Sequence, residues 1–161
     1  MTAALAEPGL RRLDALDLQR IVAIDLEHTG RSRRHFFEKR LAAATTHAED
    51  FVDIGVMRGG SLRGYAMARL LRGEFGREHV TAVLDAIGVE TTSRDLGIGQ
   101  VLMDGLSAAL KAHGARSLQS QADWTSQAML RFFEASGFEL APRMLLERSV
   151  TAPLAEPTEH S

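Results

Sequence analysis

The sequence predicts an α/β (α+β) domain in which a mixed central sheet of six to seven strands is flanked by about four helices. Three observations predict it. A nearly continuous apolar run from Ala82 to Val89 is typical of a central strand that is covered on both faces. A polar loop with two glycines follows and leads into an amphipathic helix that ends at His113-Gly114. Along the whole chain, strand and helix patterns occur in the order βααβββαβαββ, which favours a sheet with helices on its faces.

The first part of the chain carries a short strand and two helices. The strand is expected around residues 10–13. Residues 14–17 (DALD) offer N-cap side chains for an amphipathic helix that Gly30 ends. A second helix is expected from about His35 to Ala44.

A β-hairpin is predicted next. The alternating run FVDIGVM (residues 51–57) and a second run over residues 62–71 are separated by a Gly59-Gly60 step. A Gly-Gly pair between two such runs is a strong hairpin signal.

The last part of the chain predicts one strand, one helix and a closing pair of strands. The strand is expected over residues 115–123 and the helix over residues 126–135. Phe138 to Leu140 and Met144 to Val150 are expected to form an antiparallel pair. Residues 1–150 are therefore interpreted as a single domain, and residues 151–161 as a disordered tail with two of the four prolines.

Composition excludes several classes of protein. The 161 residues carry a formal net charge of −2, which provides no basic field for nucleic acid. The absence of cysteine excludes disulfides, thiolate metal sites and a cysteine acyl-enzyme. There is no apolar run of about 18 residues for a membrane helix and no signal-peptide pattern, so a cytoplasmic location is expected.

The junction after the central strand has the chemistry of an anion site. The first N–H groups of a helix lack intrahelical partners, and the helix dipole adds partial positive charge there. Gly97 and Gly99 would let a phosphate approach the backbone, and Arg94 adds a positive charge. A pair of glycines that only makes a tight turn is the alternative.

Two well-known phosphate loops do not fit. No Gly-Lys-Ser or Gly-Lys-Thr of a P-loop occurs, and Leu102 stands where the dinucleotide fingerprint needs a third glycine. The remaining pattern, R-x-x-G-x-G after a strand, resembles the acyl-CoA pyrophosphate loop of the GNAT N-acetyltransferase superfamily. The segment AMLRFFEASGF (residues 128–138) resembles the closing helix of that family and its Gly-Phe step. With the upstream hairpin and helices, the resemblance covers about residues 10–150.

The resemblance implies a GNAT fold and acetyl-CoA as the cofactor. It implies that the pantetheine arm lies along the central strand, where that strand splays from its neighbour. The residues it assigns to the cofactor are Ile87, Gly88, Val89, Arg94, Asp95, Leu96, Gly97, Ile98, Gly99 and Gln100, together with Ser126 and Phe133 in the closing helix.

Asp85 is the predicted general base. It is a lone carboxylate within an apolar strand, where burial would raise its pKa toward neutrality. Several members of the family place a proton acceptor at or near this position. A structural ion pair with an arginine is the alternative for Asp85, and Glu90 at the end of the strand is the second candidate base.

Departures from the family pattern leave the general acid unassigned. Phe133 stands in the place of the common tyrosine acid, and Ser126 in the place of a frequent asparagine. Tyr65, Asp123 and Trp124 are candidate substitutes near the acceptor.

A basic connection between the first two helices predicts an acceptor-binding lip. It carries Arg31, Arg33 and Arg34, which suit an acidic or carboxylate-bearing acceptor, although a solvated charge run is the alternative. The six histidines show no metal-ligand spacing, so no metal site is expected.

The leading functional hypothesis is an acetyl-CoA-dependent N-acetyltransferase that acts by direct transfer to an amine. The amine would belong to a small molecule or to a protein, and a homodimer is left open. A catalytically silent acyl-CoA-binding module and a plain nucleotide-phosphate binder are the alternatives.

Overall fold

The structure, a computed structural model, describes residues 9–151 except residues 74, 75, 77 and 124. Its elements in chain order are β1 (Gly9–Arg12), the 3₁₀ helix η1 (Ala15–Asp17), α1 (Leu18–Thr29), α2 (Arg34–Thr46), η2 (Ala48–Asp50), β2 (Phe51–Arg58), β3 (Ser61–Arg72), β4 (Val80–Val89), η4 (Thr91–Leu96), α3 (Ile98–Ala112), β5 (Ala115–Gln119) and α4 (Gln127–Ala135).

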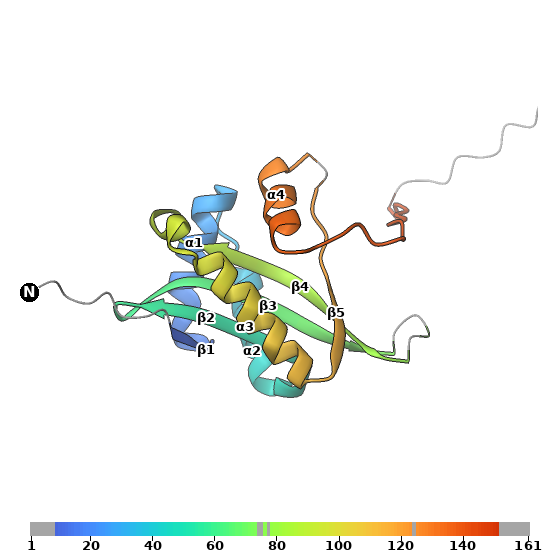
Figure 1. The fold of residues 1–161 in the computed structure, drawn as a ribbon, viewed down its shortest axis with the longest axis horizontal. Helices are drawn as coiled ribbons and strands as arrows, with labels where there is room; N and C mark the ends of the chain where they lie inside the picture. The colour runs from blue at the N-terminus through green and yellow to red at the C-terminus, as the bar shows by residue number, and fades with distance from the viewer. Residues whose placement is uncertain (1–8, 74–75, 77, 124, 152–161) are drawn as a thin grey trace, which may run out of the picture.

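The described strands form one mixed sheet in the order β1-β2-β3-β4-β5. Neighbouring strands are antiparallel from β1 to β4, whereas β4 and β5 are parallel and are joined by the α3 crossover. Helix α3 lies across one face of the sheet, and α1 and α2 cover the other (Figure 1). Each face has its own apolar core, so β3 and β4 are buried on both sides, as the apolar sequence of β4 predicts.

Local sequence signals explain the boundaries of the first elements. Asp14 accepts a hydrogen bond from the Leu16 amide, and with Asp17 it forms a capping box before α1. Gly30 ends α1 with a left-handed φ of 71°. Gly59 and Gly60 both have positive φ in the β2–β3 turn, which is the backbone that a two-residue hairpin requires.

The predicted closing strands are wrong. Residues 138–140 and 144–150 form no strand and pair with no strand among the described residues, so the described sheet has five strands and not six or seven. The strand predicted over residues 115–123 is also shorter and ends at Gln119. An apolar pattern can predict a strand with one buried face, but it does not identify the sheet edge with which that strand would pair. Of the predicted disordered tail (residues 151–161), only Thr151 is described, and residues 152–161 lie outside the described residues.

No helix in the described ranges has the length and the apolar composition needed to cross a bilayer.

Candidate functional site

Strand β4 is divided by a bulge at Asp85. Opposite it, Met67 pairs with Ala86 and Ala68 pairs with Leu84, so Asp85 is an extra residue with no partner of its own on β3. A bulge bends its strand and increases the local twist. The ladder between β4 and β5 ends just before this point, at the pair Val83–Gln119.

Beyond the bulge, β4 is open on the side away from β3. The Glu90 amide donates to the Arg63 carbonyl at 2.8 Å, so Glu90 is directed toward β3. Because backbone groups alternate sides along a strand, Gly88 is also directed toward β3, while the N–H and C=O groups of Ile87 and Val89 point to the open side. Figure 1 shows β5 running away from this end of β4. The result is a strand edge at which no other described strand pairs with β4 beyond Val83.

Gly88 lets an aromatic ring pack directly under the open edge. A Cβ atom at Gly88 would lie 2.7 Å from the Tyr65 ring, closer than real carbon contacts allow. Tyr65 is fully buried, and its hydroxyl donates to Asp25 at 3.4 Å. Burial raises the pKa of Tyr65, and the neighbouring Asp25 carboxylate raises it further. Tyr65, predicted near the acceptor, therefore has a packing role in this structure and exposes no surface to a ligand.

The first turn of α3 faces the open edge. Gly97 is its N-cap residue with a φ of 70°, and as a glycine it has no side chain to cap the following amides. A Cβ atom at Gly97 would meet nothing within 4 Å, so the space in front of it is open. Ile98 is fully buried in the core, which fixes the start of the helix. The junction thus presents the uncapped amides that an anion requires.

The second loop glycine has a different role from the first. A Cβ atom at Gly99 would lie 3.3 Å from the Phe132 ring of α4. Gly99 therefore allows α4 to pack over the start of α3. Leu96 and Gln100 are exposed beside it, and the side chains of Arg94 and Asp95 lie outside the described residues.

The end of α1 is attached to the end of β4. Nε2 of His28 lies 2.7 Å from the Val89 carbonyl oxygen, on the open side of the strand. The carboxylate of Glu27 accepts from the Thr91 amide at 2.9 Å and from its hydroxyl at 2.6 Å. Neither α1 residue was predicted from the sequence, because only the crossing of α1 over β4 brings them to the site.

Glu90 anchors the loop from within. It is only 7% exposed and accepts hydrogen bonds from Arg63 at 2.9 Å, from Arg20 and from the Thr92 hydroxyl. The Thr92 hydroxyl, followed by Arg63 and Arg20, holds the pKa of this carboxyl below its usual range against the effect of burial. These contacts fit a structural carboxylate, and a catalytic part for Glu90 stays a prediction.

Asp85 belongs to a charged cluster on the α2 side of the bulge. Its carboxylate accepts from Nε of Arg69 at 2.9 Å and from Nε of Arg40 at 3.4 Å. Arg40 is buried, donates to Asp53 at 3.2 Å and to the Ala68 carbonyl at 2.8 Å. Burial raises the pKa of Asp53 to about 6, with Arg40 opposing the shift and the Asp85 charge adding to it. Asp85 is thus ion-paired, as its structural alternative expects, and its role as a base stays a prediction.

The basic connection divides into inward and outward arginines. Arg33 donates from Nε to the buried Asp25 at 2.9 Å and lies 5.5 Å from the Phe37 ring centre, so it holds α1 and α2 together. Arg34 is exposed and pairs with Glu38 at 3.5 Å, and Arg31 is also exposed. Of the three arginines predicted to bind the acceptor, Arg31 and Arg34 are exposed, and Arg33 is partly buried against Asp25.

Helix α4 presents apolar residues to the core. Phe133 is 7% exposed and packs 4.8 Å from the Phe138 ring centre. Ser126 precedes the helix without a side-chain capping bond, and Asp123 is exposed in the loop before it. Trp124 lies outside the described residues.

One histidine lies close to two carboxylates away from this site. Ligand atoms of His47, Glu49 and Asp50 lie within 4.8 Å of one another. Two of the three are exposed, and Asp50 pairs with Arg72 at 2.5 Å. Because one of the two carboxylates is already paired and the other two groups are exposed, no metal site is assigned here.

The fold and the site together define an α+β protein whose sheet opens beside an uncapped helix start. Similar solved structures share this fold. The aminoglycoside N-acetyltransferase AAC(6')-Iy in complex with CoA has a TM-score of 0.76 at 16% identity, covering 93% of this chain and 99% of its own. Glucosamine-6-phosphate N-acetyltransferase from Arabidopsis thaliana has a TM-score of 0.65 at 14% identity, and the match covers 88% of this chain and 98% of that protein.

A third similar structure is an aminoglycoside acetyltransferase from an uncultured soil metagenomic sample, in complex with sisomicin. It has a TM-score of 0.67 at 18% identity, and the match covers 91% of this chain and 97% of that protein. A search of curated proteins found no match. A sequence model of the acetyltransferase (GNAT) family matches residues 9–138. The chain therefore belongs to the GNAT acetyltransferase family.

Proposed function

We propose that this chain is an acetyl-CoA-dependent N-acetyltransferase that transfers the acetyl group directly to an amine. The observation that carries the proposal is the open edge of β4 beside the uncapped start of α3. Backbone groups of Ile87 and Val89 face the opening, and the loop around Gly97 adjoins it.

The residues present fit acetyl-CoA. Amides from Arg94 to Gln100 would hold the pyrophosphate, because the first amides of α3 are uncapped and the space in front of Gly97 is open. The backbone of Ile87 and Val89 would hold the pantetheine arm as an added strand would be held. Bound acetyl-CoA supplies a thioester whose carbonyl carbon an amine can attack. The protein contributes mainly position and a dry, polar backbone lining.

Two residues are candidates to accept the proton of the amine. Asp85 is the candidate from the sequence, but guanidinium groups of Arg69 and Arg40 lie against its oxygens. An acceptor would have to displace an arginine to reach it. His28 lies on the open side, with Nε2 at 2.7 Å from the Val89 carbonyl oxygen. Because a carbonyl oxygen only accepts, Nε2 carries the hydrogen of this contact, and Nδ1 is the ring atom of His28 that would take the proton of the amine. Substitution of each residue distinguishes His28 from Asp85.

The exposed arginines support an acceptor that carries an acidic group. Arg31 and Arg34 lie on the α1–α2 connection, at the end of the helix that brings His28 to β4. Polycationic acceptors such as the aminoglycosides of two similar proteins would meet like charge there. We therefore propose a carboxylate- or phosphate-bearing amine over a polycationic one.

The test combines turnover with binding. Thiol release from acetyl-CoA is measured with a panel of acidic amines, neutral amino sugars, aminoglycosides and peptides, and CoA affinity is measured by calorimetry. Gln100→Glu places a carboxylate on the exposed first turn of α3, where it should weaken CoA binding by about tenfold or more through repulsion of the phosphates. Gln100→Ala is the matched control and should change the affinity little.

Equal CoA affinity in a folded Gln100→Glu protein would contradict the proposed cofactor site. Tight CoA binding without turnover on any amine would instead favour the second function, a silent acyl-CoA-binding module. The buried Phe133, in the place of the family's tyrosine acid, is the observation that favours this second function.

A further inference from the structure

Glu27 occupies a position where a carboxylate does not stabilise its own helix. It is exposed in the last turn of α1, which ends at Thr29. The helix dipole places partial negative charge at this end, so a negative side chain there is unfavourable for the helix. A residue that departs from a local rule in this way is expected to serve a contact outside its own element.

That contact is with the first residue of η4. One oxygen of Glu27 accepts from the Thr91 amide at 2.9 Å and from the Thr91 hydroxyl at 2.6 Å. These two bonds lower the pKa of Glu27, and the hydroxyl is the larger cause. Glu90, the N-cap residue of η4, makes no capping bond with its side chain, which binds Arg63 and Arg20 instead. Glu27 therefore takes the place of a capping side chain from 64 residues away.

The connection from β4 to α3 is fixed at both of its ends. Glu90 holds its start from the core, and Glu27 holds its start from the outside. The fully buried Ile98 holds its end. Two attachments on opposite sides of its first residue set the direction of η4, whereas a single attachment would leave this short helix free to pivot. The direction of η4 in turn sets where Gly97 and the first amides of α3 lie.

We propose that Glu27 is a positioning residue that holds residues 91–97 in the arrangement that accepts the pyrophosphate of CoA. It touches no substrate and acts through Thr91. This role rests on the proposed function, because it concerns the same cofactor. A loop that is held in place before binding loses less conformational entropy when the cofactor binds, and this is the source of the expected gain in affinity.

The charge of Glu27 alone predicts the opposite effect. A carboxylate beside an anion site repels phosphates, so both Glu27→Ala and Glu27→Gln would then tighten CoA binding. If position matters, Glu27→Ala should raise the dissociation constant for CoA by about five- to tenfold, because the acceptor of both bonds is lost. Glu27→Gln keeps an oxygen that accepts both bonds and should stay within about threefold of the unmodified chain. Tighter binding by both variants would overturn the proposal.

Calorimetric titration with CoA and thermal unfolding are carried out on the same preparations. A merely structural Glu27 would lower the melting temperature of Glu27→Ala and leave its dissociation constant unchanged, which would overturn the proposal. Thr91→Val removes only the hydroxyl. It should weaken CoA binding by about two- to fivefold in the unmodified background and hardly at all in the Glu27→Ala background. Additive effects would mean that the two residues act independently, and the proposal would then be wrong.

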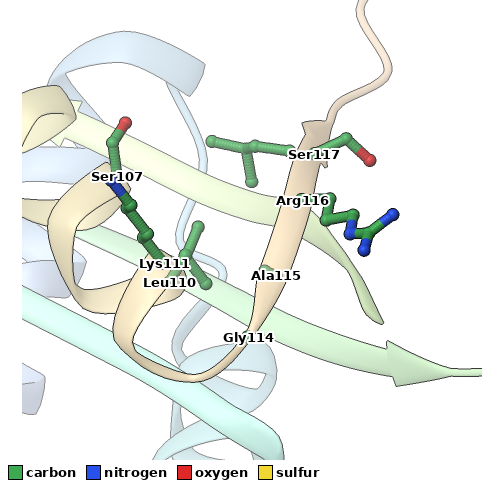
Figure 2. A pocket seen from close by; sticks show the side chains of 8 residues that line it. Ser107, Leu110, Lys111, Gly114, Ala115, Arg116 and Ser117 are labelled. Atoms are coloured by element: carbon green, nitrogen blue, oxygen red, sulfur yellow. The ribbon is translucent and has the colours of Figure 1, made fainter. Parts of the chain in front are cut away.

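Two control variants test where the phosphates bind. Glu49→Ala removes the same charge from η2, where Glu49 is exposed. Lys111→Ala removes a cation from a hollow of about 490 Å³ at the other end of α3, which Arg116 of β5 also lines (Figure 2). Both variants should bind CoA as the unmodified chain does. Weaker binding by Lys111→Ala together with unchanged binding by Glu27→Ala would place the phosphates at this hollow and contradict the role of Glu27.

The proposed function fails by a different result. An unmodified chain that binds no CoA, or an unchanged affinity in Gln100→Glu, would contradict the cofactor site itself. Tight binding by the unmodified chain, weaker binding by Gln100→Glu and unchanged binding by Glu27→Ala would overturn only the role of Glu27.

Discussion

The two halves of β4 differ in what lies beside them. From Val80 to Val83 the strand has neighbours on both sides, and the bulge that ends this half is held by Arg40 and Asp85. From Ala86 to Val89 it has β3 on one side and no strand on the other among the described residues. The closed half contributes to stability through ladder bonds and buried charge. In the open half, backbone groups of β4 have no partner strand on one side, and the start of α3 follows this end of the strand.

One strand can therefore serve stability in one half and binding in the other. Substitutions around the bulge should act mainly on the free energy of unfolding, and substitutions around the opening should act mainly on ligand affinity or turnover. Variants on the two sides of Asp85 test this separation.

The largest effect is expected from Arg40→Ala. The Arg40 side chain is 7% exposed and contacts two carboxylates, so its loss leaves Asp53 and Asp85 buried beside each other without their shared cation. The free energy of unfolding should fall by about 3 kcal/mol or more. Denaturant unfolding measures it.

Arg69→Ala is the matched control. The Arg69 side chain is 47% exposed, and its pair with Asp85 should contribute less than about 1 kcal/mol. Equal losses in the two variants would mean that the cluster around Arg40 does not stabilise the closed half.

The next effect concerns turnover. If the proton acceptor lies on the open side, His28→Asn should lower kcat by about tenfold or more while CoA affinity holds. Asp85→Asn should then lower the melting temperature and leave turnover per folded molecule nearly unchanged.

The reverse pattern would assign the base to the bulge. A fall in kcat of about ten- to a thousandfold in Asp85→Asn, with His28→Asn unaffected, would make Asp85 the proton acceptor and remove the separation of roles. A rescue of the affected variant at high pH would support proton transfer, because the amine then loses its proton unaided.

A smaller effect is expected on the pH dependence of stability. The Asp53 carboxyl has a pKa near 6 in the folded state, against an ordinary value of 3.8. Because the folded state binds this proton more tightly, the stability it contributes is fully present below pH 3.8 and is lost as pH rises through 6. The full loss should be roughly 3 kcal/mol.

Asp53→Asn should remove this loss, and the difference in unfolding free energy between the two proteins across pH 4–7 isolates it. Glu90 and Asp17, whose pKa values are lowered, contribute with the opposite sign and cancel in the difference. A constant difference across this range would contradict the raised pKa.

Much of the fold could be predicted because its signals are local. The apolar run of β4, the glycines at 59 and 60 and the cap at Asp14 each report on their own neighbourhood. The loop before α3 is likewise a contiguous pattern, and the family match supports it.

The rest depends on contacts that sequence spacing does not reveal. Asp85 meets Arg40 across 45 residues, and His28 meets Val89 across 61. Residues 144–150 were predicted to be a strand but form none, because an apolar pattern does not identify the edge that would pair with it. The candidate site was therefore predicted less completely than the fold.

The most direct test of the central claim is amide hydrogen exchange along β4 with and without CoA. The amides of Ile87 and Val89 face the opening and should exchange quickly in the free protein and slowly with CoA bound. The amides of Ala86 and Gly88 are directed toward β3 and should be protected in both states. Slowing at Ile87 and Val89 alone is the predicted result. If CoA leaves these two amides unchanged while binding elsewhere, the open half of β4 is not the cofactor site.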